Sequence, residues 1–431
     1  MRAPLALLAG LVLATLAPAS AGAAPLVGTQ DGGVLSASES ISAIKREVDS
    51  MAKLHGQVAR FEVSWAALEP HVQGERDPAV VALIDAYVDT AAKHGIRPIL
   101  YIDRTPCWAS SAPDDVRQGC KGVDANRSEV WRYAPAEAAS AVPVSTFLAQ
   151  RYGPRLAAFQ LWNEPDQSNQ KYWAGGDKVR RYVRFAKAVY PAVKAVAPTL
   201  PVLAGSFVGA DGRWLTALYD AGMKGSYDGL SVQFYDLPLY ALNRTRQVQL
   251  AHGDTTPLWL TEFGYTSCAG VNGKPTQLAD HPCVTRKVQA QNLTDVFAAT
   301  VNTRWLAAAV VYALHDESTA YQFGALDRSR KRKPSYAVLS RAAARKSGKY
   351  RAPVLRLRRT GGVVRAVGSA PGIDIYTLRV KVAGTLRFRA VLRADRFNRF
   401  SVKVPAALGS SRLTATITRQ WDGRLYHAKR S

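Results

Sequence analysis

The chain has 431 residues, of which 47% are hydrophobic and 21% charged, and this balance excludes an intrinsically disordered protein. Its formal net charge of +24 by itself suggests nucleic acid or an anionic surface as a partner. However, residues 1–327 carry 30 basic and 30 acidic side chains, whereas residues 328–431 carry 27 basic and 3 acidic ones. A neutral body with a cationic last quarter is not the profile of a dedicated nucleic-acid-binding protein.

The N-terminus has the pattern of a secretory signal peptide. Met1 and Arg2 precede an apolar run over residues 3–17, and candidate Ala-x-Ala cleavage sites end at Ala21 and Ala23. The run is too short to span a bilayer and lacks a charged stop after it. We therefore expect residues 1–23 to be cleaved off, the protein to be secreted and extracellular, and no segment to span a membrane.

Strand-like and helix-like stretches alternate regularly after this leader. The strand-like stretches, rich in Val, Ile, Leu and Phe, cover residues 26–30, 58–64, 97–102, 156–161, 201–205, 229–235, 257–262 and 307–313. The helical patterns cover residues 41–55, 78–94, 135–152, 178–197, 212–223, 239–253, 285–302 and 334–346. This alternation predicts an α/β fold, a (β/α)8 TIM barrel over residues 24–347, with a doubly wound open sheet as the alternative. No glycine-rich phosphate-binding motif follows the first strand, so we expect no nucleotide and no other cofactor.

The helical period disappears near residues 348–353. Short alternating segments follow, at residues 354–358, 363–367, 375–382, 386–392, 399–404, 412–419 and 425–428, and they predict a small all-β sandwich over residues 350–431. Arg and Lys recur at alternate positions, as at Arg387 and Arg389, which places one charged face outward. Such a domain either buttresses the barrel or anchors it to an anionic polymer such as an envelope polysaccharide. Few aromatic residues and the export signal argue against nucleic acid.

The four cysteines predict disulfide bonds. They are Cys107, Cys120, Cys268 and Cys283, and an even count is typical of exported chains. Three pairings are possible, of which the sequence-local one joins Cys107 to Cys120 and Cys268 to Cys283. Neither spacing matches a metal or redox motif, and the histidines are scattered, so we expect no metal.

Two glutamates stand where apolar strands end, the place of catalytic residues in TIM barrels. Residues 161–165 read Leu-Trp-Asn-Glu-Pro and put Glu164 on the fourth strand, and residues 260–264 read Leu-Thr-Glu-Phe-Gly and put Glu262 on the seventh. Glycoside hydrolysis needs two such carboxylates, because one protonates the leaving oxygen and the other attacks the anomeric carbon or activates water. The alternative is that both are ordinary loop carboxylates.

These motifs resemble those of retaining glycoside hydrolases, family 39-like or family 5-like, whose acid/base and nucleophile lie on strands four and seven. The resemblance spans residues 26–345 and includes Val-Ala-Arg-Phe at 58–61, Trp-Ala-Ala-Leu-Glu-Pro at 65–70, Thr-Pro-Cys-Trp-Ala at 105–109 and Lys-Pro-Ser-Tyr at 333–336. It implies a carbohydrate substrate, Glu164 as general acid/base after the expected Asn163, and Glu262 as nucleophile. We expect a monomer.

Further residues are candidates for the same site. Arg60 and Tyr235 are expected to hold Glu262 ionised, and Asn163 to bind the sugar 2-hydroxyl. An alternative role for Arg60 is a structural ion pair with Glu62 or Asp103. Trp108, Trp162 and Trp173 offer flat faces for the sugar. The alternative for Trp108 and Trp173 is that they are core aromatics.

The sequence departs from the family pattern on two strands. Where His-x-Tyr is usual on strand six, Gln233 and Tyr235 stand on one face by alternation. Gln233 is either a substrate-binding residue or a hydrogen-bonded amide of the barrel. Residues 312–316, Tyr-Ala-Leu-His-Asp, replace the usual Trp on strand eight, and His315 is either a substrate-binding residue or a packed histidine. The neutral amide of Gln233 keeps one alternative function open, a non-catalytic carbohydrate-binding protein on a decayed barrel.

Overall fold

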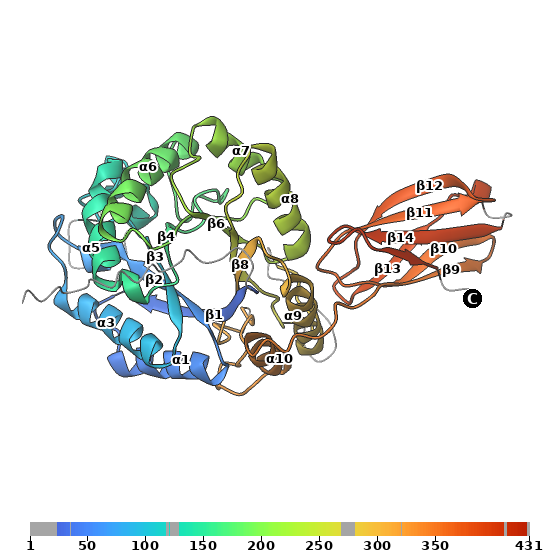
Figure 1. Cartoon of the computed structure of the whole chain (residues 1–431), viewed down its shortest axis with the longest axis horizontal. Coiled ribbons are helices and arrows are strands. Elements are labelled where there is room, and N and C mark those ends of the chain that lie inside the picture. Colours follow the sequence, from blue (N-terminus) through green and yellow to red (C-terminus); the bar gives the residue numbers. More distant parts are fainter. Residues whose placement is uncertain are drawn as a thin grey trace, which may run out of the picture.

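The computed structural model describes residues 24–34, 36–117, 120, 129–268, 281–319, 321–408 and 412–428. The predicted signal peptide over residues 1–23 lies outside the described residues. Eight parallel strands form a closed barrel in chain order, β8 pairing back onto β1 (Figure 1). They are β1 Leu26–Val34, β2 Val58–Ser64, β3 Arg97–Asp103, β4 Ala158–Leu161, β5 Val202–Phe207, β6 Gly229–Gln233, β7 Leu258–Phe263 and β8 Leu306–Tyr312. The prediction of a TIM barrel is confirmed, and the open sheet is wrong.

Helices surround the barrel between successive strands (Figure 1). The longer ones are α1 Ile41–Lys53, α3 Pro78–Lys93, α5 Val142–Tyr152, α6 Lys178–Val196, α7 Arg213–Asp220, α8 Pro238–Ala251, α9 Arg286–Thr300 and α10 Pro334–Ala343, and the short ones are α2 Trp65–Leu68 and α4 Asp114–Arg117. The α-helix expected from residue 135 begins only at Val142, after the 3-10 turn η4 Ala138–Ala141. Pro143 explains this start, because proline fits only the first turn of a helix.

The barrel interior changes from apolar to charged along the strands. On β2, Ala59, Phe61 and Val63 pack outward in the core beneath the helices, while the alternate residues point inward. The inner residues at the N-terminal end of the strands form an apolar layer that includes Val58, Ile99, Ala158, Leu203 and Ala308. Arg60 lies two residues further along β2 and begins the polar layer, so the chemistry collects at the C-terminal ends of the strands.

The last quarter of the described chain forms two antiparallel sheets. One has the strand order β13-β10-β9 and the other β12-β11-β14-β15. The strands are β9 Val354–Thr360, β10 Val363–Ser369, β11 Tyr376–Val382, β12 Thr385–Leu392, β13 Arg399–Lys403, β14 Leu413–Arg419 and β15 Leu425–His427. Their inner faces share a separate core that contains Tyr376, Leu378 and Ile417. The predicted β-sandwich after the barrel is confirmed.

The sandwich is seated on helices α8 and α9 of the barrel (Figure 1). Asp295 of α9 is fully buried and accepts hydrogen bonds from Arg351 Nε at 2.8 and 3.0 Å. The Trp421 indole lies 5.8 Å from the ring of Trp305 and donates to the backbone carbonyl of Ala299 at 3.3 Å. These contacts hold the two parts together through side chains as well as through the connecting segment.

Replacing Asp295 with Ala should weaken this junction. Arg351 would lose a charge-assisted pair of hydrogen bonds to a buried carboxylate, which we expect to cost about 1–3 kcal/mol of unfolding free energy. Chemical denaturation of the full chain measures this loss, and trypsin should cut faster near residues 347–353. Asp89→Ala breaks an exposed ion pair with Arg155 and should cost less than about 1 kcal/mol. Equal losses in both variants would contradict the junction's role.

The disulfides follow the sequence-local pairing. Cys107 joins Cys120 with a Cα–Cα distance of 5.8 Å, and Cys268 joins Cys283 with one of 5.0 Å. Cys107 follows β3 and Cys268 follows β7, so both bonds brace loops on the C-terminal side of the barrel. The predicted disulfide bonding is confirmed.

Candidate active site

Glu262 lies near the C-terminal end of β7 and is only 5% exposed. The guanidinium of Arg60 donates to its Oε1, and the hydroxyl of Tyr235 donates to its Oε2. Burial raises the pKa of Glu262, while the Arg60 charge and the Tyr235 hydrogen bond act in the opposite direction. Both oxygens are thus fixed in place by partners that favour the anion, as an attacking carboxylate requires.

Arg60 is the centre of a buried polar network. Its side chain is fully buried, and its guanidinium carbon lies 3.9 Å from the ring centroid of Tyr101. Besides Glu262, its hydrogen-bond acceptors are Gln30 Oε1 at 2.7 Å, Gln160 Oε1 at 3.2 Å and Asn163 Oδ1 at 2.7 Å. Every nitrogen of the guanidinium therefore has an acceptor, which holds the charge in one orientation.

Glu62, which was considered as an ion-pair partner of Arg60, pairs with Arg104 instead. Glu62 accepts from Arg104 Nε at 2.7 Å and from the Tyr101 hydroxyl at 3.0 Å. Asp103 is buried near both, and burial together with the Glu62 charge raises its pKa well above the ordinary value. The ion-pair partner of Arg60 is therefore Glu262, and the suggested pairing of Arg60 with Glu62 or Asp103 is wrong.

Asn163 is linked to Glu262 through Arg60 and to Glu164 through Ser206. Its Oδ1 accepts from Arg60 at 2.7 Å, from Ser206 Oγ at 3.1 Å and from Gln233 Nε2 at 3.0 Å. Gln233 Nε2 also donates to Ser206 Oγ at 2.9 Å. These bonds all fall on Oδ1, so among the described residues the Nδ2 donor of Asn163 has no such partner and can donate to a ligand. The amide of Gln233 thus orients Asn163.

Glu164 is held in an unusual backbone conformation. Its φ is +39°, and Trp162 two residues earlier has a φ of +72°. Positive φ values are uncommon for residues with side chains and concentrate at functional sites. The amide nitrogen of Glu164 donates to Ser206 Oγ at 3.2 Å, and its Oε2 accepts from Gln167 Nε2 at 2.7 Å.

The environment of Glu164 favours its protonated form. Burial, followed by the charges of Glu262 and Asp166, raises its pKa to about 8. Asp166 is itself fixed by the backbone amides of Val208 and Gly209, at 3.0 and 2.9 Å. At neutral pH one carboxyl is therefore a proton donor, while the other is paired with a cation, which is the division needed for acid-assisted displacement.

Strand β6 ends at Gln233, two residues before the predicted end, and yet Tyr235 reaches the site. Its hydroxyl contacts Glu262, and its ring packs against Phe323, with centroids 5.4 Å apart. Gln233 contacts Asn163 instead. Tyr235 therefore contacts the carboxylate of Glu262, whereas Gln233 contacts the amide of Asn163.

The tryptophans take different places. Trp162 and Trp173 are 0% and 1% exposed and pack edge to face at 5.1 Å, so their suggested role as sugar platforms is wrong. Trp108 is only partly buried, and its indole donates to the Glu69 carbonyl at 2.8 Å. It is the ring of the three that retains an accessible face.

His315 is placed against an outer helix. Its Nδ1 lies 3.1 Å from Glu47 Oε2 of α1, and Glu47 also pairs with Arg330. The structure thus does not group His315 with the two glutamates, and this contact fits the packed alternative.

Several residues of the site were missed from the sequence. Gln30 and Gln160 accept from Arg60, and Ser206 holds Asn163 and Glu164. Burial, followed by the nearby charge of Glu164, raises the pKa of Tyr172. The available signal was a polar residue inside an apolar barrel strand, as at Gln160 between Phe159 and Leu161.

The described residues contain no group of His, Cys, Asp and Glu suited to a metal ion. Within the same residues, no helix combines the length and apolarity needed to cross a bilayer.

Solved structures share this fold. A family 39 glycoside hydrolase of Bacteroides cellulosilyticus WH2 is 16% identical, with a TM-score of 0.51 over 89% of this chain and 80% of that one. The family 39 enzyme of Xanthomonas axonopodis pv. citri is 15% identical, with a TM-score of 0.53 over 89% and 93%. A family 39 β-xylosidase of Caulobacter crescentus is 16% identical, with a TM-score of 0.50 over 89% and 95%.

At these identities the likeness concerns the fold, and at that level the resemblance to family 39 is confirmed. No protein-family model matches the sequence, and no curated protein matches it. The chain thus has the architecture of the glycoside hydrolases that its motifs resemble, and its chemistry has to be argued from its own residues.

Proposed function

We propose that this protein is a retaining glycoside hydrolase that cleaves O-glycosidic bonds of an oligosaccharide or polysaccharide, with Glu164 as acid/base and Glu262 as nucleophile. The observation that carries the proposal is the asymmetry of the two buried carboxyls. The pKa of Glu164 is raised to about 8, whereas Glu262 is held by Arg60 and Tyr235. The similarity in fold to family 39 enzymes supports it.

The reaction proceeds by two displacements. Glu262 attacks the anomeric carbon while Glu164 gives its proton to the departing oxygen, so the glycosidic bond breaks as an ester to Glu262 forms. Glu164, now ionised, then takes a proton from water, whose oxygen attacks the same carbon and releases Glu262. Asn163 Nδ2 donates to the sugar 2-hydroxyl, a contact that strengthens as charge develops on the ring.

Export belongs to the same proposal. The N-terminal pattern of residues 1–23 and the two disulfides are typical of secreted proteins. N-terminal sequencing of protein recovered from the culture medium should begin near residue 22 or 24. A chain that stays in the cells with Met1 or Arg2 at its N-terminus would contradict export.

The stereochemistry of the product tests the mechanism. A panel of aryl glycosides identifies a substrate, and proton NMR then follows the anomer that forms first. We expect the configuration of the substrate to be retained, because two inversions occur at one carbon. The inverted anomer as first product would refute Glu262 as nucleophile. Binding without turnover on every glycoside would favour the non-catalytic alternative.

The value of kcat/KM should fall on the alkaline side of its pH profile, near pH 8. Glu164 must be protonated to act as acid, and because its pKa is raised to about 8, activity is retained below that value and lost as pH rises through it. Asp166→Asn removes a neighbouring negative charge and should move this limb of kcat/KM to lower pH. Lys171→Gln removes a positive charge and should move it slightly higher. Shifts of the same sign in both variants would contradict the assignment.

A further inference from the structure

The sheet β13-β10-β9 carries a row of cations on its outer face. Register pairs Arg365 with Arg358 on one side and with Lys403 on the other, so three cations stand side by side across all three strands. Two residues further along β10, Val367 pairs with Arg356 of β9, and after another two residues Ser369 pairs with Arg399 of β13. Alternation puts these side chains on the solvent side, and all five cations are exposed.

Among the described residues, four of these five cations lack the acidic partner that usually balances such a surface, while the fifth, Arg399, has its Nε 3.9 Å from Asp395 Oδ2. Within the described residues, Arg356, Arg358 and Lys403 form no ion pair, and Arg365 donates only to Ser401 Oγ at 3.3 Å. Like charges directly opposite one another destabilise a sheet. Because strands lie about 4.8 Å apart, the row accumulates repulsion that an anion lying across it would relieve.

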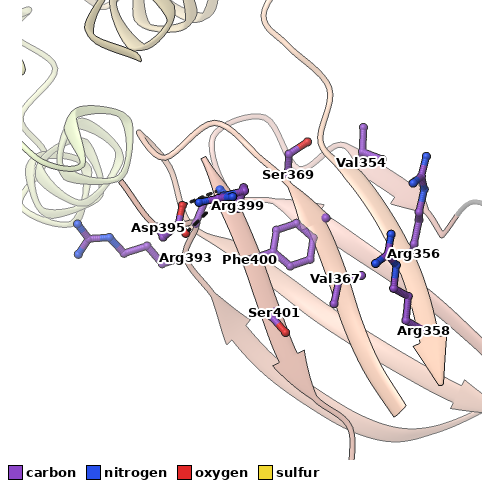
Figure 2. Close-up of a pocket in the computed structure, with 12 residues that line it drawn as sticks. Val354, Arg356, Arg358, Val367, Ser369, Arg393, Asp395, Arg399, Phe400 and Ser401 are labelled. Atoms are coloured by element: carbon purple, nitrogen blue, oxygen red, sulfur yellow. Dashed lines mark hydrogen bonds and ion pairs between the residues drawn. The ribbon is translucent and has the colours of Figure 1, made fainter. Parts of the chain in front are cut away.

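A shallow groove of about 880 Å³ covers one end of this face, where its lining includes Arg356, Arg358 and Arg399, and Arg365 and Lys403 lie outside that lining (Figure 2). Figure 2 shows Arg356 and Arg358 projecting from β9 beside Val367, with Ser401 on the neighbouring part of the sheet. Asp395 is the one acidic residue of the lining, and it accepts hydrogen bonds from the backbone amides of Phe397 and Arg399 at 2.8 and 2.9 Å. The floor is therefore cationic with small apolar and hydroxyl patches between the charges.

The groove ends beside the mouth of the barrel. Arg393 in its lining points toward the barrel helices and pairs with Asp236 (Figure 2). Asp236 follows Tyr235, whose hydroxyl contacts Glu262. A chain lying in the groove would thus be held next to the loop that carries a residue of the active site.

We propose that the outer face of β9, β10 and β13 binds an acidic polysaccharide, by pairing its carboxylates with this arginine-rich row. Arginine suits the task, since its planar fork binds carboxylates in a bidentate manner. Single-stranded nucleic acid is the weaker fit, because proteins bind it by stacking bases on aromatic rings. The one aromatic residue of the lining, Phe400, is 7% exposed and packs in the sandwich core.

Polygalacturonate is a suitable probe, and two triple variants provide a matched comparison. Arg358→Ser/Arg365→Ser/Lys403→Ser removes the cross-strand row. Lys381→Ser/Arg387→Ser/Arg389→Ser removes three exposed cations from β11 and β12 of the other sheet, and so changes the net charge equally. Affinity electrophoresis of the full chain then measures binding without any need for turnover, so the result is separate from the proposed hydrolase activity.

We expect the first variant to bind polygalacturonate at least tenfold more weakly and with a smaller dependence on salt, and the second to stay within twofold of the parent chain. Neutral hydroxyethylcellulose should not be retained by this face in any of the proteins. Equal losses in both variants, or no retention of the parent chain, would overturn the proposal. Tighter binding to a single-stranded oligonucleotide than to polygalacturonate would overturn it in favour of nucleic acid.

Thermal unfolding gives a second readout that does not depend on electrophoresis. Without polymer, the first triple variant should be at least as stable as the parent chain, because it loses like-charge repulsion. With polygalacturonate, the midpoint of the parent chain should rise and that of this variant should not, since a ligand stabilises only the form that binds it. A rise of equal size in both proteins would contradict the assigned surface.

Discussion

Replacing Glu262 with Ala should lower kcat on an aryl glycoside by at least about 10⁴-fold, the scale seen when a nucleophile is removed. No other described carboxylate is paired in the same way with Arg60 and Tyr235. The shortened side chain leaves room beside Arg60 for a small anion. Azide should therefore restore turnover in this variant by attacking the anomeric carbon, and NMR should show a glycosyl azide of inverted configuration.

Two comparisons make the Glu262 experiment specific. Glu164→Ala should also respond to azide, but its product should keep the configuration of the substrate, because the nucleophile is still present. Glu137→Ala removes an exposed glutamate and should change kcat less than twofold. Undiminished activity of Glu262→Ala would refute the nucleophile assignment.

Replacing Arg60 with Met should produce the largest loss of stability. Glu262 would remain buried without its cation, and breaking a buried pair by removing one partner costs about 3–5 kcal/mol. The remaining burial would raise the pKa of Glu262 further, so the acidic limb of the activity profile should move to higher pH. Denaturant unfolding and the pH dependence of kcat/KM measure the two effects.

A double variant separates charge from packing at this position. In Arg60→Met/Glu262→Gln no buried charge is left unpaired, so part of the lost stability should return. Arg155→Met breaks an exposed pair with Asp89 and should cost less than about 1 kcal/mol. The losses of unfolding free energy in Arg60→Met and in Glu262→Gln provide the comparison. If the double variant lost more than the sum of these two losses, the pairing of Arg60 with Glu262 would not be the source of the effect.

The barrel and its two glutamates could be predicted because strong local signals coincide with a known topology. An apolar strand followed by Asn163 and Glu164, and another with Glu262 near its end, place both carboxyls at the same end of a parallel barrel. The sandwich was predictable from the change to period-two alternation. The pairing of β10 with β13 was not, because it sets Arg365 against Lys403, which lie on strands that are not consecutive in the chain.

The inner network could not be read from the sequence for a different reason. Gln30 and Gln160 lie on strands that are not neighbours, and they meet only through Arg60 inside the closed barrel. His315 shows the converse, since its place after β8 suggested the active-site mouth whereas the chain turns it to Glu47 of α1. Exposure, which decided between platform and core for Trp162 and Trp173, also depends on tertiary packing.

The separation of charge along the chain has a consequence for how the molecule approaches a surface. Residues 1–327 are balanced, while residues 328–431 carry 27 basic and 3 acidic side chains, and the sandwich projects from one side of the barrel (Figure 1). Such a distribution is an electric dipole with its positive pole at the sandwich. In the field of an anionic wall it experiences a torque as well as an attraction, so the molecule would arrive sandwich first and in a preferred orientation.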